Sequence, residues 1–245
     1  MSRVVAPGRA MGLSYGIVLR QLITRGRIAS LVLVGAVVTA VAFAVGAADD
    51  RRDPVETGVR LISDLGFTTL VPIVALVFAS AALGDMREDG TLVYLWLRPM
   101  DRWPIVVGAW LAAVTVSLPL TLLPLLASSI AVDGGSSLVG ATAVAGTVGV
   151  LAYTAVFVLV GLLLKNAIVW GLGYVLIWEG IVAAFGSFAA KLAIRGYTRS
   201  ILTSVTEVDL DLGDLSLGAG IVVPLMASVV ALGLASYRLR VMDIV

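Results

Sequence analysis

The chain has 245 residues, of which 60% are hydrophobic and only 13% are charged, whereas about 25% are charged in an ordinary soluble domain. A soluble globule cannot bury that much apolar surface, so the composition predicts a polytopic membrane protein. The sequence contains no Cys and no His, which excludes disulfides, thiolate chemistry and the commonest general base and metal ligand.

The N-terminal segment is basic and has a helical pattern. In residues 11–27, the apolar side chains of Tyr15, Val18, Leu19 and Leu22 follow the spacing of one helical face, and Arg and polar residues fill much of the remainder. This pattern predicts an amphipathic helix that lies in the membrane interface. An ordinary basic anchor beside the first span is the alternative, and both interpretations place this end of the chain in the cytoplasm.

The first two hydrophobic runs predict membrane-spanning helices. Residues 28–48 carry no charge and are long enough to cross about 30 Å of hydrocarbon. A second span is predicted at 65–84, after a charged external segment. In that segment, Asp53 and Pro54 have the order of an N-cap and a first helical residue, so a helix is expected to begin at Pro54 and can run on into the span. Pro72 should bend this span or open it locally.

Four further hydrophobic runs complete a six-span pattern. Ala141, Ala145 and Gly149 form a stripe of small residues on the fourth span, along which another helix can approach closely. The short link Lys165-Asn166 predicts that the fourth and fifth spans form an antiparallel hairpin. The predicted spans lie at 104–131, 138–164, 167–190 and 217–236, with an external loop at 191–216 that can hold a short helix over 198–206.

The distribution of charge predicts the orientation. Six spans place both termini on one side, and the segments on that side hold 11 of the 17 Lys and Arg residues. Because an excess of Lys and Arg marks cytoplasmic loops, both termini are expected in the cytoplasm. Residues 1–245 are therefore predicted to form a single all-α transmembrane domain in the plasma membrane (the cell's inner membrane), in contact with lipid.

The loop at 85–103, between the second and third spans, combines basic, turn and aromatic residues and reads DMREDGTLVYLWLRPMDRW. The apolar side of a short helix can be formed by Leu92, Leu95, Trp96 and Pro99, and Asp101 is a candidate N-cap for the third span. Such a helix can lie on the membrane surface or insert into a groove on a partner protein.

A longer pattern runs through this loop: Glu-x-Gly-Thr-Leu, a few apolar residues, Arg-Pro-x-x-Arg, and Ile-Val-x-Gly at the start of the next span. It is carried by Glu88, Gly90, Thr91, Leu92, Arg98, Pro99, Arg102, Ile105, Val106 and Gly108. In this pattern the chain resembles the ABC-2 type permeases, the membrane subunits of ABC exporters. The basic N-terminus, the loop after the fifth span and the basic tail extend the resemblance over nearly the whole chain. Ala109 departs from it, since many members have Lys at that position.

The resemblance implies an ABCG-like fold of six transmembrane helices with an N-terminal interfacial helix. It also implies a coupling helix that docks on a separate nucleotide-binding ATPase subunit, and a second permease subunit, identical or different, that pairs around a substrate path. The chain has no Gly-x4-Gly-Lys-Ser/Thr loop, so ATP and Mg²⁺ are expected on the partner. No catalytic residue, metal ion or nucleic acid is expected on this chain. The residues implied in coupling are Glu88, Gly90, Thr91, Leu92, Leu95, Arg98 and Pro99.

Glu179 lies near the middle of the fifth predicted span. A carboxylate there costs roughly 3 kcal/mol on insertion scales, which makes it a candidate for lining or gating the substrate path. Two other interpretations stay open: a side chain that is protonated or hydrogen-bonded to a neighbouring helix and stabilises packing, or a position near the outer surface at the head of a re-entrant segment. Glu179 also supports an alternative function, a proton-coupled secondary transporter. An intramembrane hydrolase is disfavoured because no second membrane carboxylate accompanies Glu179.

Overall fold

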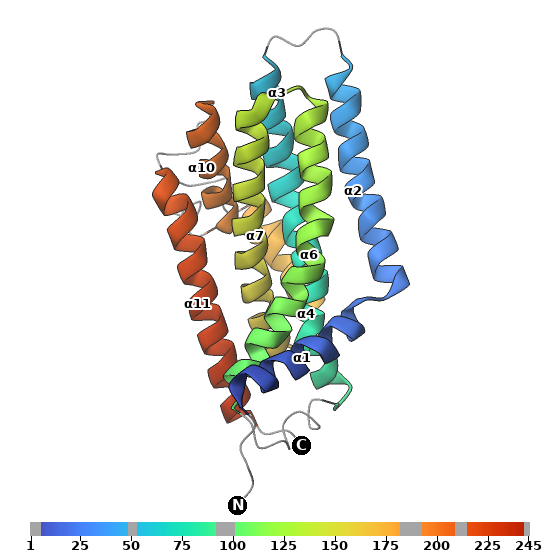
Figure 1. Ribbon diagram of the computed structural model, residues 1–245, viewed down its shortest axis with the longest axis vertical. Coiled ribbons are helices and arrows are strands. Elements are labelled where there is room, and N and C mark those ends of the chain that lie inside the picture. Colours follow the sequence, from blue (N-terminus) through green and yellow to red (C-terminus); the bar gives the residue numbers. More distant parts are fainter. Residues whose placement is uncertain (1–5, 49–52, 92–100, 182–192, 209–214, 243–245) are drawn as a thin grey trace, which may run out of the picture.

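The computed structural model describes residues 6–48, 53–91, 101–181, 193–208 and 215–242 (Figure 1). Every regular element in these ranges is helical, and five helices are long and apolar enough to cross a membrane. The protein is therefore an all-helical, multi-pass membrane protein. The five helices are α2 (Arg25–Gly46), the continuous helix Pro54–Glu88, α6 (Trp103–Ala131), α7 (Gly135–Leu163) and α11 (Leu217–Val241).

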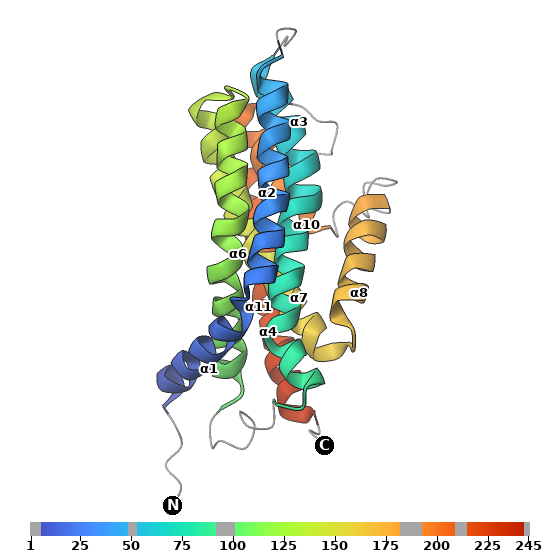
Figure 2. The ribbon, with the colours of Figure 1, turned by 90° about the vertical axis from the view of Figure 1, so that its right-hand side faces the viewer.

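The long helices run side by side, and α1 (Pro7–Leu22) crosses one end of the bundle (Figures 1 and 2). We call this the α1 end. The last turns of α11 and of the helix Pro54–Glu88 also lie there, whereas the turn between α6 and α7 lies at the opposite end. The helices on the two sides of the bundle, α2 and α11, each have 22% of their most apolar stretch buried, against 72% for Pro54–Glu88. The latter is thus the central helix, and the outer two leave most of their surface uncovered by the rest of the chain.

The N-terminal helix differs from its prediction in extent and in surroundings. α1 spans Pro7–Leu22 rather than residues 11–27, and α2 begins at Arg25 after a short break. Val18 and Leu22, on the apolar face of the predicted interfacial helix, are fully buried within the protein. The reason is a close contact with α6, where Gly108 leaves room for the α1 backbone and a side chain would overlap Ser14. The Ser14 hydroxyl also donates a hydrogen bond to the Pro104 carbonyl, at 3.2 Å.

The start of the central helix follows the expected capping chemistry. Asp53 Oδ1 accepts hydrogen bonds from the backbone N–H groups of Val55 (2.9 Å) and Glu56 (3.2 Å), which satisfies donors that have no partner inside the helix. The helix begins at Pro54, as predicted, and continues as α3 (Pro54–Leu61), η1 (Ile62–Leu70) and α4 (Val71–Glu88). The first residues of the predicted loop at 85–103 are therefore helical.

Pro72 explains why the central helix is widened in its middle. The segment η1 is a π-helix that ends just before α4, which has Pro72 in its first turn. Proline has no N–H for the carbonyl four residues earlier, and its ring crowds that carbonyl, so wider turns before it relieve the clash. Within η1, the Thr68 hydroxyl donates to the Ser63 carbonyl at 3.0 Å.

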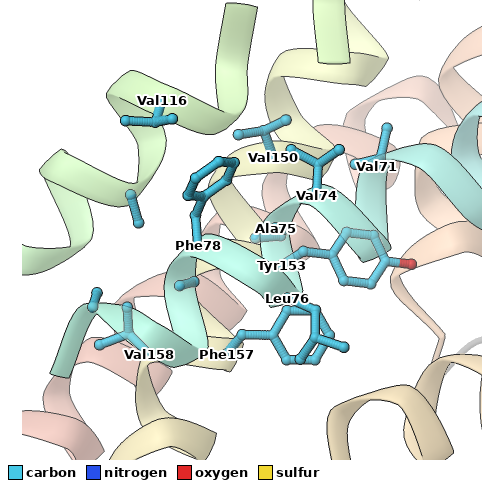
Figure 3. Packing of buried hydrophobic residues seen from close by; sticks show 14 of the residues in the cluster. Val71, Val74, Ala75, Leu76, Phe78, Val116, Val150, Tyr153, Phe157 and Val158 are labelled. Carbon is cyan, nitrogen blue, oxygen red and sulfur yellow. The ribbon is translucent and has the colours of Figure 1, made fainter. Parts of the chain in front are cut away.

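The core of the bundle lies between α4, α6 and α7 (Figure 3). The Tyr153 and Phe157 rings of α7 stack with centroids 6.0 Å apart, and Phe78 of α4 extends towards Val116 of α6. At the α1 end of this interface, Gly161 of α7 packs directly on the α4 backbone. α4 and α7 therefore form a closely packed pair.

The N-cap of α6 and the small-residue stripe of α7 were both predicted from the sequence. The N-cap of α6 is Arg102, so the prediction of Asp101 at that position is wrong. The small-residue stripe of α7 is buried, and a side chain at Gly149 would press on Thr198 and Val71, so the close approach comes from two neighbouring helices.

The segment after α7 is shorter than the other apolar helices. α8 (Ala167–Gly173) continues into a second π-helix, η2 (Tyr174–Ile181), and the remainder of the predicted span at 167–190 lies outside the described residues. A sixth crossing by this segment stays a prediction. The predicted external loop at 191–216 contains α10 (Ile194–Thr206), which begins earlier than the short helix expected at 198 and packs against α7 and α11. Figure 2 shows α8 beside the central helix.

Candidate functional site

Glu179 belongs to η2, is 0% exposed, and directs its carboxylate towards α7. Tyr153 of α7 donates a hydrogen bond to Oε2 of this carboxylate, and Tyr174 of η2 donates to Oε1 at 2.9 Å. The Ile194 backbone N–H and the Arg195 side chain, both at the start of α10, also lie near the carboxylate. Because both oxygens accept hydrogen bonds, the cost of removing the carboxylate from water is offset.

These contacts bear on the interpretations of Glu179 that the sequence left open. The carboxylate is hydrogen-bonded to a neighbouring helix, as the packing interpretation expects. A position near the outer surface of the membrane, at the head of a re-entrant segment, stays a prediction, because burial inside the bundle does not set the depth of the side chain in the membrane. A role in the substrate path or its gating stays a prediction.

Two arginines on α10 extend the polar site towards the central helix. Arg195 and Arg199 are only 9% and 8% exposed. Arg199 Nη2 forms an ion pair with Asp64 Oδ1 at 2.5 Å and lies 3.3 Å from Thr68 Oγ1, and Arg195 Nη1 donates to the same hydroxyl at 3.4 Å. Burial lowers the pKa of Arg199 and the neighbouring Arg195 lowers it further, while Asp64 opposes both effects. Arg199 therefore depends on Asp64 for compensation of its charge.

We call these residues the polar cluster: Asp64, Thr68, Tyr153, Tyr174, Glu179, Arg195 and Arg199. The cluster forms where the two π-helical segments, η1 and η2, come into contact beside the start of α10. π-helical turns are rare and often occur at functional sites. Two carboxyl groups face two guanidinium groups, and buried charges persist in apolar surroundings when they are paired in this way.

The polar cluster is open on one side. The Asp64 side chain is 71% exposed, whereas the Arg199 side chain that it contacts is 10% exposed. An ionised side chain on an apolar helix is costly against lipid, and such residues usually face a water-filled space or another protein. The side of the bundle that carries Asp64 is therefore the candidate for a polar path.

Sequence reasoning missed Asp64, Arg195 and Arg199 as members of a site. Asp64 was assigned to the external segment before the second span, and the two arginines were assigned to the external loop at 191–216. Both assignments follow from charge, since each segment is charged and lies outside the most apolar runs. A signal was present: two arginines four positions apart on one helical face, and an isolated carboxylate at the edge of the central span. The pairing itself spans 135 positions, which no local pattern records.

The second candidate region is the predicted coupling loop at the α1 end. Leu92, Leu95, Arg98 and Pro99 lie outside the described residues. The remaining three predicted residues are placed at the end of α4. Glu88 is the last residue of that helix, Gly90 has a left-handed backbone (φ +67°), and the Thr91 hydroxyl donates to the Met86 carbonyl at 3.3 Å. Gly is suited to that conformation because it has no Cβ.

Two contacts join this region to other parts of the α1 end. Asp85 pairs with Arg27 of α2 at 2.7 Å, with both side chains about one third exposed. Glu88 Oε1 accepts a hydrogen bond from the Asn166 backbone N–H at 2.9 Å. The structure therefore places Glu88 against the turn that precedes α8, and it does not bring Glu88 and Glu179 together.

Within the described ranges, no group of three or more acidic side chains gathers to hold a metal ion. Comparison with protein-family models and with curated proteins finds no match for this chain. The resemblance to ABC-2 permeases therefore depends on the residues of 85–108 and on the order of the hydrophobic helices.

Proposed function

We propose that this chain is the permease subunit of an ATP-binding cassette exporter, driven by a separate ATPase subunit. The observation that carries the proposal is the position of the Glu-x-Gly-Thr-Leu sequence. It begins at the last residue of the most buried of the five described membrane helices. A force applied to that segment acts directly on the centre of the bundle rather than on a lipid-facing helix.

The packing supports transmission of such a force. α4 and α7 are in backbone contact, since a side chain at Gly161 would overlap the Ser80 carbonyl. A displacement of α4 along its axis would therefore carry α7 with it. Tyr153 of α7 and Asp64 of the central helix both belong to the polar cluster, so movement at the α1 end would reach the candidate path.

The finer parts of the proposal follow the resemblance. The α1 end faces the cytoplasm, residues 167–190 make a sixth crossing, and a second permease chain completes the substrate path. ATP and Mg²⁺ bind to the ATPase subunit. The cargo crosses on the side of the bundle that carries the exposed Asp64 carboxylate.

Detergent extraction from the native membrane tests the proposal. We expect the chain to purify with an ATP-binding subunit, and Leu92→Asp to weaken that association because a charge replaces an apolar docking side chain. Leu164→Asp is a matched control, since Leu164 is an exposed apolar residue at the α1 end. Intact association and intact ATPase coupling in Leu92→Asp would contradict the docking role.

Labelling tests the orientation separately. The chain has no Cys, so a single cysteine introduced at position 93 reports the side of the membrane without a background signal. We expect modification only by reagents that reach the cytoplasm. Modification by an impermeant reagent from outside would overturn the proposed function.

A second candidate function, a proton-coupled transporter, is favoured by one observation: Glu179 is buried and hydrogen-bonded to two tyrosine hydroxyls. Such a protein would work without an ATPase and would stop when the proton gradient is collapsed. Transport by the purified chain alone in vesicles, abolished by Glu179→Gln, would favour this function over the first.

A further inference from the structure

Glu88 belongs to the motif that suggests an ATPase contact, yet its carboxylate is turned towards the chain itself. Oε1 accepts the backbone N–H of Asn166 at 2.9 Å. α7 ends at Leu163 and α8 begins at Ala167, so Asn166 is the N-cap residue of α8, with a left-handed backbone (φ +54°). Among the described residues, the Asn166 side chain makes no capping hydrogen bond of its own.

The geometry is that of a capping box completed from another helix. In the usual box, an acidic side chain in the third position of a helix accepts a hydrogen bond from the N-cap backbone N–H. The third residue of α8 is Val169, which has no acceptor. Glu88 of α4 supplies the carboxylate instead, and it places negative charge beside the positive end of the helix.

The capped helix leads directly to the polar cluster. α8 continues without a break into η2, which carries Tyr174 and Glu179. Between these points α8 also contacts α4, because Gly171 fits against the Leu76 side chain. The end of α4 and the helix that holds Glu179 are thus joined at two levels.

We infer that Glu88 is a positioning residue that couples the segment after α4 to the helix 167–181. This inference rests on the proposed function and deepens it: a push on the coupling loop moves the start of α8 through the Glu88–Asn166 hydrogen bond, as well as moving α4. It differs from a docking role, in which the Glu88 charge would contact the ATPase surface.

Two substitutions separate these roles. Glu88→Gln removes the charge but keeps an acceptor oxygen for the Asn166 N–H, whereas Glu88→Ala removes both. If Glu88 positions α8, Gln retains most of the function and Ala does not. If Glu88 contacts the ATPase through its charge, both variants lose the contact. Glu56→Ala is a control, because Glu56 is an exposed acidic residue of the same long helix that pairs with Arg60, one turn along, at 2.8 Å.

The first measurement needs no partner. Amide hydrogen exchange at Asn166 is followed by NMR on the purified chain in detergent micelles. We expect about fivefold faster exchange in Glu88→Ala, as the loss of one hydrogen bond implies, and little change in Glu88→Gln or Glu56→Ala. Unchanged exchange in Glu88→Ala, with a wild-type circular dichroism spectrum and melting curve, would overturn the inference and leave the proposed function intact.

The second measurement uses the complex with its ATPase subunit. We expect Glu88→Ala to keep the ATPase bound but to lose stimulation of its activity by the permease, and Glu88→Gln to keep both. Equal loss of ATPase binding in the two variants would overturn the positioning role. If the wild-type chain binds no ATPase, the proposed function fails, while the exchange result at Asn166 still decides whether the hydrogen bond positions α8.

Discussion

The polar cluster and the α1 end both contain ionic contacts, but they differ in burial. In the polar cluster, Arg199 pairs with Asp64 through side chains that are 10% and 71% exposed, and the neighbouring Glu179 is 0% exposed. At the α1 end, Arg27 and Asp85 form their ion pair with side chains that are 31% and 33% exposed. Breaking a buried pair leaves a charge without water or partner, whereas an exposed pair is partly replaced by solvent.

This difference in burial suggests that the polar cluster is rigid and that the α1 end can move. In the polar cluster, the contacts of the buried Glu179 and Arg199 side chains are costly to break, so they hold η1, η2, α7 and the start of α10 in one arrangement. Contacts at the α1 end can break and reform at small cost, which suits a region that receives a push from a partner. The comparison leads to three predictions, ordered by the expected loss of stability.

The largest effect is expected from Glu179→Ala. The substitution removes the acceptor of two tyrosine hydroxyls and leaves Arg195 without its nearby carboxylate. Removing one partner from a buried charged network costs roughly 3–5 kcal/mol, which reversible unfolding in mixed micelles can measure. Glu179→Gln keeps the shape and one acceptor oxygen, so a much smaller loss is expected. Equal losses for Ala and Gln, or a loss under about 1 kcal/mol for Ala, would show that the cluster does not hold the helices together.

An intermediate effect is expected for the Asp64–Arg199 pair, since one partner is buried and the other is 71% exposed at the side chain. A double-mutant cycle with Asp64→Asn and Arg199→Gln should give a coupling energy of about 1–2 kcal/mol, between the values for surface and buried pairs. The cycle Glu56→Gln with Arg60→Gln, an exposed pair on α3, serves as the control. A coupling energy as small as that of the control pair would mean that Arg199 is compensated elsewhere.

The long helices could be predicted because their signals are local. The apolar stretches of α6 and α7 differ from the predicted spans by only a few residues at their ends. Asp53 and Pro54 fix the start of the central helix through hydrogen bonds within its first turn. These features depend on residues that are close together in the sequence.

The contacts between helices could not be predicted in the same way. The apolar face of α1 could pack against lipid or against protein. It packs against α6, because Gly108 lets the α1 backbone approach closely. The polar cluster depends on a pair separated by 135 positions. The partner of Glu88 is the backbone N–H of Asn166, and a backbone group leaves no side-chain signal in the sequence. The residues of the motif were visible, but the direction in which Glu88 points was not.

The smallest effect is expected for the exposed pair at the α1 end. Arg27→Gln and Asp85→Asn should each lower the free energy of unfolding by less than about 1 kcal/mol, because water and salt screen both partners. The double-mutant coupling should shrink further when salt rises from about 0.05 M to about 0.5 M, whereas that of Asp64 and Arg199 should change less because Arg199 is shielded. Measuring both cycles at the two salt concentrations tests the comparison directly. If the Arg27–Asp85 coupling exceeded about 2 kcal/mol and did not fall with salt, the α1 end would be held as rigidly as the polar cluster. Contacts at the α1 end could then not break at low free-energy cost when a partner displaces the coupling loop.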